Sequence, residues 1–117
     1  MQLLCAHSDE GDVDCLGLIP APVRHFQPAP GRRVPHMGWN QLQRVAEHPL
    51  TEGLEAPAWA YFVHSYAVPV GDWTLATCEY GSPFSAMVRA GNFHGAQFHP
   101  ERSSAIGARV LKNFLAL

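Results

Sequence analysis

The sequence predicts an α/β domain in which several short strands are followed by a C-terminal helix. Apolar runs of strand length recur between residues 58 and 98, separated by glycine or asparagine. Apolar residues at helical spacing follow after residue 103. With 117 residues, of which 47% are hydrophobic and 15% charged, the chain fits one globular domain over residues 1–117.

The N-terminal region is expected to contain a short helix and one strand. Residues 1–6 are apolar and helix-forming, so they look like the later part of a helix that ends near His7. The polar segment from Asp9 to Asp12 contains a glycine breaker. After an apolar segment that ends at Pro20, residues 23–26 have room for one strand.

The segment around Trp39 is predicted to be a loop, because the tryptophan lies between Gly38 and Asn40. A tryptophan in a loop is either a buried plug or an anchor at an interface. The residues themselves favour neither reading. Residues 48–57, with two prolines and a glycine, also form a predicted loop.

The strongest predicted strand runs over residues 58–68, which are rich in aromatic residues and valine. Its nearly continuous apolar character predicts burial on both faces. Three further strands are predicted at 74–80, 85–89 and 93–98. The tight turns between them favour antiparallel pairing of neighbours.

The last predicted element is a helix with Ser103 or Ser104 as its N-cap. Its apolar residues repeat at helical spacing, and we expect them on one buried face. The residues of this stripe are Ile106, Val110, Leu111, Phe114 and Leu115. Arg109 and Lys112 lie off the stripe, where positive charge near the helix C-terminus is favourable.

Composition argues against several classes of function. A net charge of −2 gives no sign of a nucleic-acid or anionic membrane surface, and no apolar run is long enough to span a bilayer. Three cysteines at irregular spacing argue against a disulfide framework and fit a reducing cytosol. The seven histidines are scattered, and Cys5 with His7 lacks a second ligand pair, so no metal is expected.

A catalytic pair is predicted near the C-terminus, in the stretch Gly95–Glu101. Pro100 cannot donate to a sheet ladder, so the strand ends where His99 stands. Glu101 is close enough to hold an imidazole N–H of that histidine. A base with an orienting acid is two-thirds of a nucleophilic triad, and the pair still requires a serine or cysteine.

The stretch Gly95–Glu101, with a serine-rich helix start after it, resembles the terminal motif of class I (triad) glutamine amidotransferases. Many such enzymes share the His-Pro-Glu sequence. The stretches Pro35–Asn40 and Tyr61–Tyr66 are more specific, and they look like the glutaminase subunit of imidazole glycerol phosphate synthase, from histidine biosynthesis. The resemblance runs over the whole chain. It implies the C-terminal half of a flavodoxin-like fold, in a cytoplasmic enzyme with no cofactor.

The family's nucleophile is a cysteine on a strand-to-helix elbow, and Met1-Gln2 resembles the Met-Gln that follows it. The resemblance therefore implies a catalytic cysteine three residues before Met1. We expect an N-terminally truncated chain that is inactive alone and exposes apolar surface. Cys5 in the predicted helix, Cys15 near a loop and Cys78 in a strand are not expected to replace that nucleophile.

The resemblance assigns roles to individual residues. His99 would move the proton while a thiolate attacks the side-chain amide of L-glutamine, and Glu101 would orient the imidazole. The residues implied in binding L-glutamine are Gln2, Glu10, Ser65 and Tyr66. These residues also have non-functional interpretations: Glu10 as a solvated charge in a loop, and Ser65 and Tyr66 as ordinary residues at the end of a strand.

A partner is implied as well. In this family ammonia passes to a TIM-barrel synthase subunit, with which the glutaminase forms a heterodimer. The residues implied in docking that subunit are Met37, Trp39, Asn40, Tyr61 and Arg102. Arg102 stands where the family usually has lysine, which keeps the charge but changes the geometry.

Two other functions fit parts of this sequence. One is a non-catalytic amidotransferase-like module that retains only the partner-docking face. The other is an unrelated small α+β domain with a chance His-Pro-Glu sequence. Two independent motifs in the right order disfavour the latter.

Overall fold

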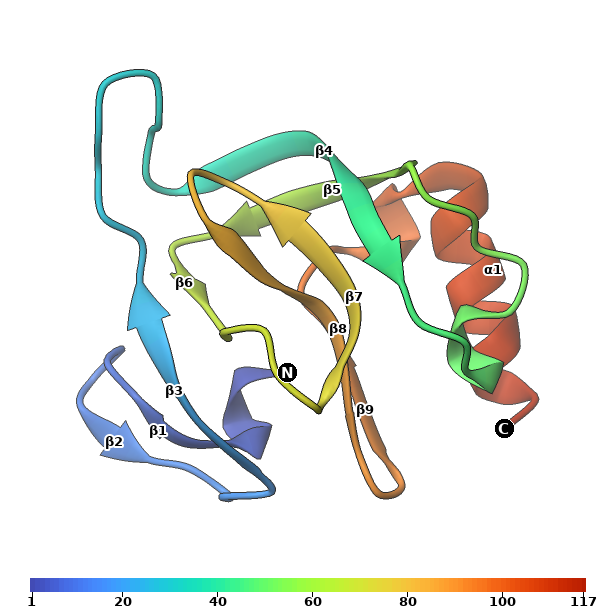
Figure 1. Ribbon diagram of the computed structural model, residues 1–117, viewed down its shortest axis with the longest axis horizontal. Helices are drawn as coiled ribbons and strands as arrows, with labels where there is room; N and C mark the ends of the chain where they lie inside the picture. The colour runs from blue at the N-terminus through green and yellow to red at the C-terminus, as the bar shows by residue number, and fades with distance from the viewer.

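The computed structural model describes residues 1–117 and is a mixed α/β structure, mostly strands with one C-terminal helix (Figure 1). The strands are β1 Cys5–Ser8, β2 Val13–Asp14, β3 Ile19–His25, β4 His36–Val45, β5 Ala58–His64, β6 Tyr66–Ala67, β7 Thr74–Glu79, β8 Pro83–Ala90 and β9 Phe93–Ala96. The helices are the 3₁₀ helices η1 Gln2–Leu4, η2 Pro49–Thr51 and η3 Pro100–Arg102, and the α-helix α1 Ser104–Leu115. The predicted fold class is confirmed.

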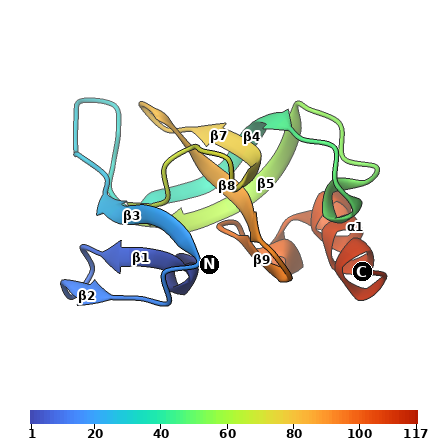
Figure 2. The same cartoon turned by 60° about the horizontal axis from the view of Figure 1, so that its bottom comes forward.

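The strands form two sheets. The larger has five strands in the order β5-β4-β7-β8-β9, all paired antiparallel. The smaller has the order β2-β1-β3-β6, and its β1 and β3 are parallel. Figures 1 and 2 show the small sheet on one side of the molecule, α1 on the other, and the five-stranded sheet between them. No helix here combines the length and the apolar character that crossing a membrane requires.

The core has two parts. The main part gathers fully buried residues of the five-stranded sheet, such as Leu42 and Phe62, with Val110 of α1. Phe98 belongs to this main part and directly precedes His99, so the predicted catalytic loop begins next to a residue that is anchored in the core. The smaller part joins β1 and β3 to the larger sheet through residues that include Ile19 and Val88. Burial of these apolar groups is the main source of stability for such a chain.

The strands predicted at 74–80, 85–89 and 93–98 are confirmed as β7, β8 and β9, but the last is shorter than predicted, since β9 ends at Ala96 and does not reach His99. Their neighbours pair antiparallel, as the short turns predicted.

The predicted N-terminal helix is wrong. Residues 2–4 make only one 3₁₀ turn, and Cys5 begins a strand. The fully buried Cys5 pairs with Ile19, and its carbonyl accepts a 2.8 Å hydrogen bond from the Gly17 N–H. Tertiary pairing has overridden a local helix preference, which is a weak determinant over so few residues.

The loop predicted around Trp39 is also wrong, because His36 already begins β4. This strand pairs with β5 in continuous register from His36 opposite His64 to Leu42 opposite Ala58. Trp39 remains 49% exposed, so it is not a buried plug.

The expectation that residues 58–68 are buried on both faces is wrong. The strand ends at His64, and its residues alternate between buried and more accessible positions, with Phe62 fully buried and Trp59 exposed. The reason is that β5 belongs to an antiparallel sheet and turns only one face to the core. After Ser65 the chain enters β6, which pairs with β3 in the smaller sheet.

The C-terminal helix is confirmed, but its buried face differs from the predicted stripe. The buried positions are Gly107, Val110 and Asn113. Three stripe residues, Leu111, Phe114 and Leu115, are exposed. The cause is a polar anchor: Asn113 Nδ2 donates to the carbonyl oxygens of Leu50 (2.9 Å) and Glu52 (2.8 Å) and turns that face of α1 towards η2.

Candidate active site

His99 and Glu101 form the predicted pair. His99 Nδ1 lies 2.9 Å from Glu101 Oε1, and both side chains are accessible. The pKa of Glu101 lies below its ordinary value, first because its own backbone N–H bonds the carboxylate and then because His99 does. An ionised carboxylate only accepts hydrogen bonds, so Nδ1 carries the proton and Nε2 is the free base. This is the orientation that a general base needs.

Both the N–H and the carbonyl of His99 are linked to Tyr61 of β5 by hydrogen bonds. Its N–H donates to the Tyr61 carbonyl at 3.0 Å. Its carbonyl accepts a 2.7 Å bond from the hydroxyl of Ser103, and that hydroxyl accepts the Tyr61 N–H at 3.0 Å. Ser103 stands at the N-cap position but makes no side-chain cap, contrary to the capping role predicted for it. The buried Ser103 therefore belongs to the candidate site, and sequence reasoning missed it.

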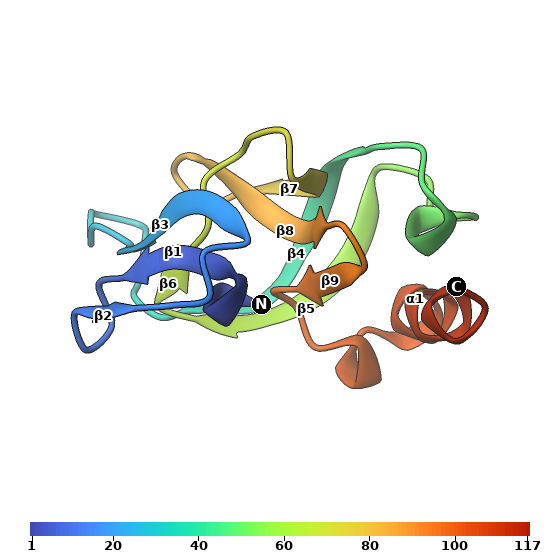
Figure 3. The ribbon, with the colours of Figure 1, turned by 90° about the horizontal axis from the view of Figure 1, so that it is seen from below.

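The predicted substrate residues Gln2 and Tyr66 meet in space. Gln2 Nε2 donates to the Tyr66 carbonyl at 3.2 Å and to Gln97 Oε1 at 2.8 Å. A Cβ built on Gly95 would come within 2.8 Å of the Met1 side chain, so the N-terminal residues lie directly against β9. Figure 3 shows the N-terminus beside that strand. Gln97 was missed, and its only sequence signal was its place two residues before His99.

Glu10 and Gln2 share a cavity of about 340 Å³. That volume is at the small end of the range for ligand pockets. Cys15 also lines this cavity. Ser65 does not line the cavity, and its carbonyl accepts the Phe26 N–H at 2.9 Å. The structure thus brings together three of the four predicted substrate residues, through a bond or a shared cavity, and leaves Ser65 to one side.

Four of the five predicted docking residues form one surface. Met37 and Trp39 project from the same face of β4 and are 63% and 49% exposed. The Trp39 ring meets the Tyr61 ring edge-on at 6.0 Å, and the Arg102 guanidinium lies 4.1 Å from the centre of the Tyr61 ring. We call Met37, Trp39, Tyr61 and Arg102 the aromatic face.

Asn40 does not belong to the aromatic face. Alternation along β4 sends its side chain to the opposite side from Trp39. There Asn40 Nδ2 donates to the Glu79 carbonyl at 2.9 Å and to His36 Nε2 at 3.1 Å.

The three cysteines are all free thiols. Cys5 and Cys78 are buried, and burial raises the pKa of Cys5 and brings that of Cys78 to about 11. Buried thiols with raised pKa values are poor nucleophiles. Cys15 is more accessible, and its thiol lies 3.8 Å from the Val13 carbonyl. None of the three makes a hydrogen bond to His99.

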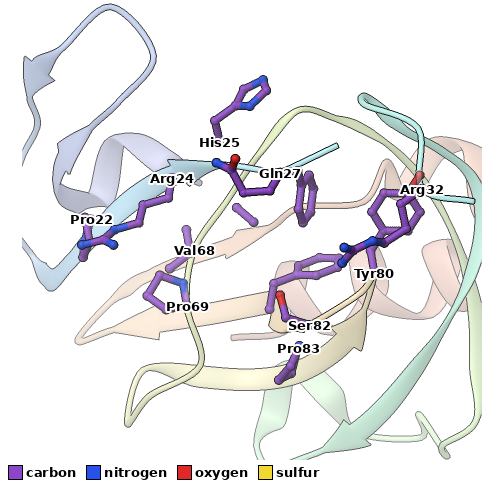
Figure 4. A pocket seen from close by; sticks show the side chains of 13 residues that line it. Pro22, Arg24, His25, Gln27, Arg32, Val68, Pro69, Tyr80, Ser82 and Pro83 are labelled. Atoms are coloured by element: carbon purple, nitrogen blue, oxygen red, sulfur yellow. The ribbon is translucent and has the colours of Figure 1, made fainter. Parts of the chain in front are cut away.

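A second cavity, of about 460 Å³, lies apart from these residues, between β3 and the ends of β7 and β8. Figure 4 shows Arg24 and Arg32 at opposite ends of it, with Tyr80 beside Arg32. None of the predicted site residues lines this cavity. It is therefore separate from the candidate active site.

Comparison with known proteins gives a family match. The model of the family described as glutamine amidotransferase class-I matches residues 1–117. The imidazole glycerol phosphate synthase subunit HisH of Xanthomonas campestris pv. campestris (strain 8004) is 58% identical over 117 residues, 100% of this chain and 58% of the relative. The subunits of the same name from Xanthomonas euvesicatoria pv. vesicatoria (strain 85-10) and Xylella fastidiosa (strain Temecula1) are 59% and 56% identical over the same shares. The chain thus spans 58% of the length of these relatives.

Proposed function

Because the chain belongs to the class-I glutamine amidotransferase family, we propose that it carries the acid–base and glutamine-binding part of a glutaminase. The reaction is hydrolysis of L-glutamine to glutamate and ammonia. The observation that carries the proposal is the 2.9 Å bond between His99 Nδ1 and Glu101, which leaves Nε2 as the base.

The proposed chemistry uses these two residues in turn. His99 Nε2 takes the proton of a cysteine thiol, and the thiolate attacks the side-chain amide carbon of glutamine. The imidazolium, supported by the Glu101 carboxylate, then gives its proton to the leaving nitrogen, and ammonia departs. Water hydrolyses the remaining glutamyl thioester, with His99 again as base. Neither residue needs a metal or cofactor for these steps.

The thiol itself is proposed to come from outside these 117 residues. Burial and raised pKa values disfavour Cys5 and Cys78, and no bond links Cys15 to His99. The greater length of the relatives leaves room for such a segment. We accordingly propose that the 117-residue chain has no glutaminase activity by itself.

Substrate recognition is assigned to the cavity shared by Gln2 and Glu10. The Glu10 carboxylate would meet the ammonium of glutamine, and the Gln2 carboxamide would hydrogen-bond its polar groups. Tyr66 supports Gln2 through its carbonyl. Ser65 was expected to contact glutamine as well, and we keep that role only for its backbone.

The partner is proposed to be the cyclase subunit of imidazole glycerol phosphate synthase, with which the chain would form a heterodimer. The relatives' names identify them as subunits of that synthase. The aromatic face, with exposed Trp39 and an arginine stacked on Tyr61, has the residue types that dominate binding energy at interfaces. Ammonia would pass across this interface to the TIM-barrel subunit. Three free thiols suit a cytoplasmic protein.

The test is a fusion in which the segment of the Xanthomonas campestris relative not matched by this chain is joined to residues 1–117. We expect it to release glutamate from glutamine in the presence of the cyclase subunit. His99→Ala in the fusion should abolish this release, whereas His25→Ala, on an exposed strand position, should leave it unchanged. Full activity in the His99→Ala fusion would contradict the proposal.

The second candidate is a non-catalytic module that only docks on a partner. The accessible aromatic face favours it, as does the lack of any thiol bonded to His99. A fusion that binds the cyclase subunit but releases no glutamate would support this reading over the first.

A further inference from the structure

Two buried histidines, His36 and His64, face each other across β4 and β5 behind the aromatic face. They are directly paired in the sheet register, and His36 Nδ1 lies 2.9 Å from His64 Nε2. Both are buried, and aromatic rings surround them. The rings in contact with one or both are Phe26, Phe62, Tyr80 and Phe84. Neither histidine has a part in the function proposed so far.

Asn40 sets the direction of the first hydrogen bond. Its Oδ1 accepts the Gln41 N–H at 2.7 Å, so the other side-chain atom is the nitrogen. That nitrogen donates to the Glu79 carbonyl and to His36 Nε2. His36 Nε2 is therefore an acceptor, and the proton of this ring is on Nδ1.

The other end of the chain of bonds demands the same arrangement. His64 Nδ1 lies 2.8 Å from the Tyr66 carbonyl, which only accepts, so Nδ1 carries the proton. His64 Nε2 is then bare and accepts the proton of His36 Nδ1. A second proton on either ring would set two donors against each other at one of these contacts. Burial also lowers the pKa of both histidines, which keeps both rings neutral.

The chain of bonds ends at the candidate glutamine site. The Tyr66 carbonyl that accepts from His64 also accepts from Gln2 Nε2, and Gln2 is bonded to Gln97 as well. Tyr66 lies where the chain changes from the larger sheet to the smaller one. At such a junction the direction of a carbonyl depends on the groups that bond it.

We propose that His36 and His64 are positioning residues: they fix the Tyr66 carbonyl, which in turn holds the carboxamide of Gln2, a residue that lines a cavity together with Glu10. The inference rests on the proposed function, because it gives the two histidines a role in glutamine binding. They do not touch the substrate. Their effect passes along a series of hydrogen bonds that runs from Asn40 through His36 and His64 to the Tyr66 carbonyl, which also accepts from Gln2.

The hydrogen bonds are tested by NMR on the 117-residue chain. We expect both rings to show the Nδ1–H tautomer and the Gln2 side-chain amide to exchange slowly with water. His64→Leu should speed this exchange about tenfold, the effect of losing one hydrogen bond. His64→Asn should restore slow exchange, because its amide nitrogen can stand where Nδ1 stood. His25→Leu is the matched control, since His25 touches the Tyr66 ring at 4.9 Å but not its carbonyl.

Equal exchange in the wild type and in folded His64→Leu would overturn the proposal, as would equal effects of His64→Leu and His64→Asn. Where His64→Leu does not fold, His36→Phe decides, because phenylalanine keeps the stacking on Phe62 and Tyr80. It should remove the donor to His64 Nε2, leave the His64 ring less firmly held against the Tyr66 carbonyl, and speed Gln2 exchange. Unchanged exchange there would equally overturn the proposal.

The role in glutamine binding is tested in the active fusion. His64→Leu should raise the KM for glutamine about tenfold with little change in kcat, and His64→Asn should return it close to the wild-type value. A fall in kcat alone would contradict a positioning role in binding. A fusion without any activity would overturn the proposed function instead, while Gln2 exchange would still decide whether the histidines position that side chain.

Discussion

The hydroxyl of Ser103 donates a 2.7 Å hydrogen bond to the carbonyl oxygen of His99 and so fixes the backbone of the predicted catalytic base. The same hydroxyl accepts the Tyr61 N–H at 3.0 Å. Tyr61 carries the Arg102 guanidinium on its ring and stands beside Trp39. One buried hydroxyl therefore connects the catalytic loop with the aromatic face.

Replacement of Ser103 by alanine should destabilise the fold and disturb the site together. It leaves the Tyr61 N–H without a partner and the His99 carbonyl with only the Arg102 N–H, at a cost of about 1–3 kcal/mol. Urea unfolding of the chain measures the loss of stability. Ser104→Ala is the control, because Ser104 is exposed and makes no side-chain hydrogen bond. Equal stability of the two variants would contradict the role given to Ser103.

Gly107→Ala should loosen α1 from the catalytic loop. A Cβ at this buried position would lie 1.7 Å from the Pro100 carbonyl oxygen, so the helix and η3 must separate. Such overpacking against backbone costs about 3 kcal/mol, more than alanine gains in helix propensity. Ala108→Gly, on the exposed side of α1, should cost only about 1 kcal/mol. Thermal unfolding of both variants, with the NMR signals of His99 as a local probe, checks this prediction.

Glu101→Gln should reduce the turnover of the active fusion about 10²–10⁴-fold while the fold stays intact. The amide keeps the size of the carboxylate but carries no negative charge, so the imidazolium loses its electrostatic support. Glutamate release measures the effect. Glu52→Gln, at an exposed position in the loop after η2, should be neutral. Turnover within twofold of the wild type would show that Glu101 does not orient the base.

Stability should fall as the pH falls below about 6.5. Burial first, and the facing His64 second, lower the pKa of His36 to about 4. Between that value and 6.5 the unfolded chain binds a proton that the folded chain does not, so folding weakens as the pH drops. From His36 alone we expect about 2 kcal/mol less stability at pH 5 than at pH 7.

The measurement is urea unfolding at the two pH values, in the wild type and in His36→Phe. The groups facing His36 are His64, Asn40 and Tyr80, and the pKa of His64 is lowered too, so it adds to the effect. His7 acts in the opposite sense, because Asp14 and Asp12 raise its pKa. Both chains are therefore compared in a His7→Asn background. An equal loss of stability in the two would contradict the assignment to His36.

Sequence patterns were most reliable where local chemistry decides the structure. The turns after Glu79 and Ala90 correctly predicted the antiparallel strands. Pro100 starts η3 directly after His99, although β9 already ends at Ala96. The motif also predicted the His99–Glu101 bond, because only one residue separates the two side chains. These features depend on neighbours in the sequence.

The failures share a different cause, which is that distant residues decided them. Cys5 forms a strand because Ile19 pairs with it, and Asn113 turns α1 so that Leu115 is exposed. Gln97 and Ser103 acquired their roles from Gln2 and Tyr61, far away in the chain. Asn40 was grouped with Trp39 because the resemblance implies a docking role for both, but in a strand the side chains of neighbouring residues point to opposite faces.

The most direct measurement is mass spectrometry of the fusion after reaction with a diazoketone analogue of glutamine, in the wild type and in His99→Ala. We predict one covalent adduct, on a cysteine of the added segment, and its loss or strong slowing when His99 is replaced. An adduct on Cys5, Cys15 or Cys78, or equal labelling of the two proteins, would contradict the proposal that His99 and Glu101 activate a thiol from outside these residues.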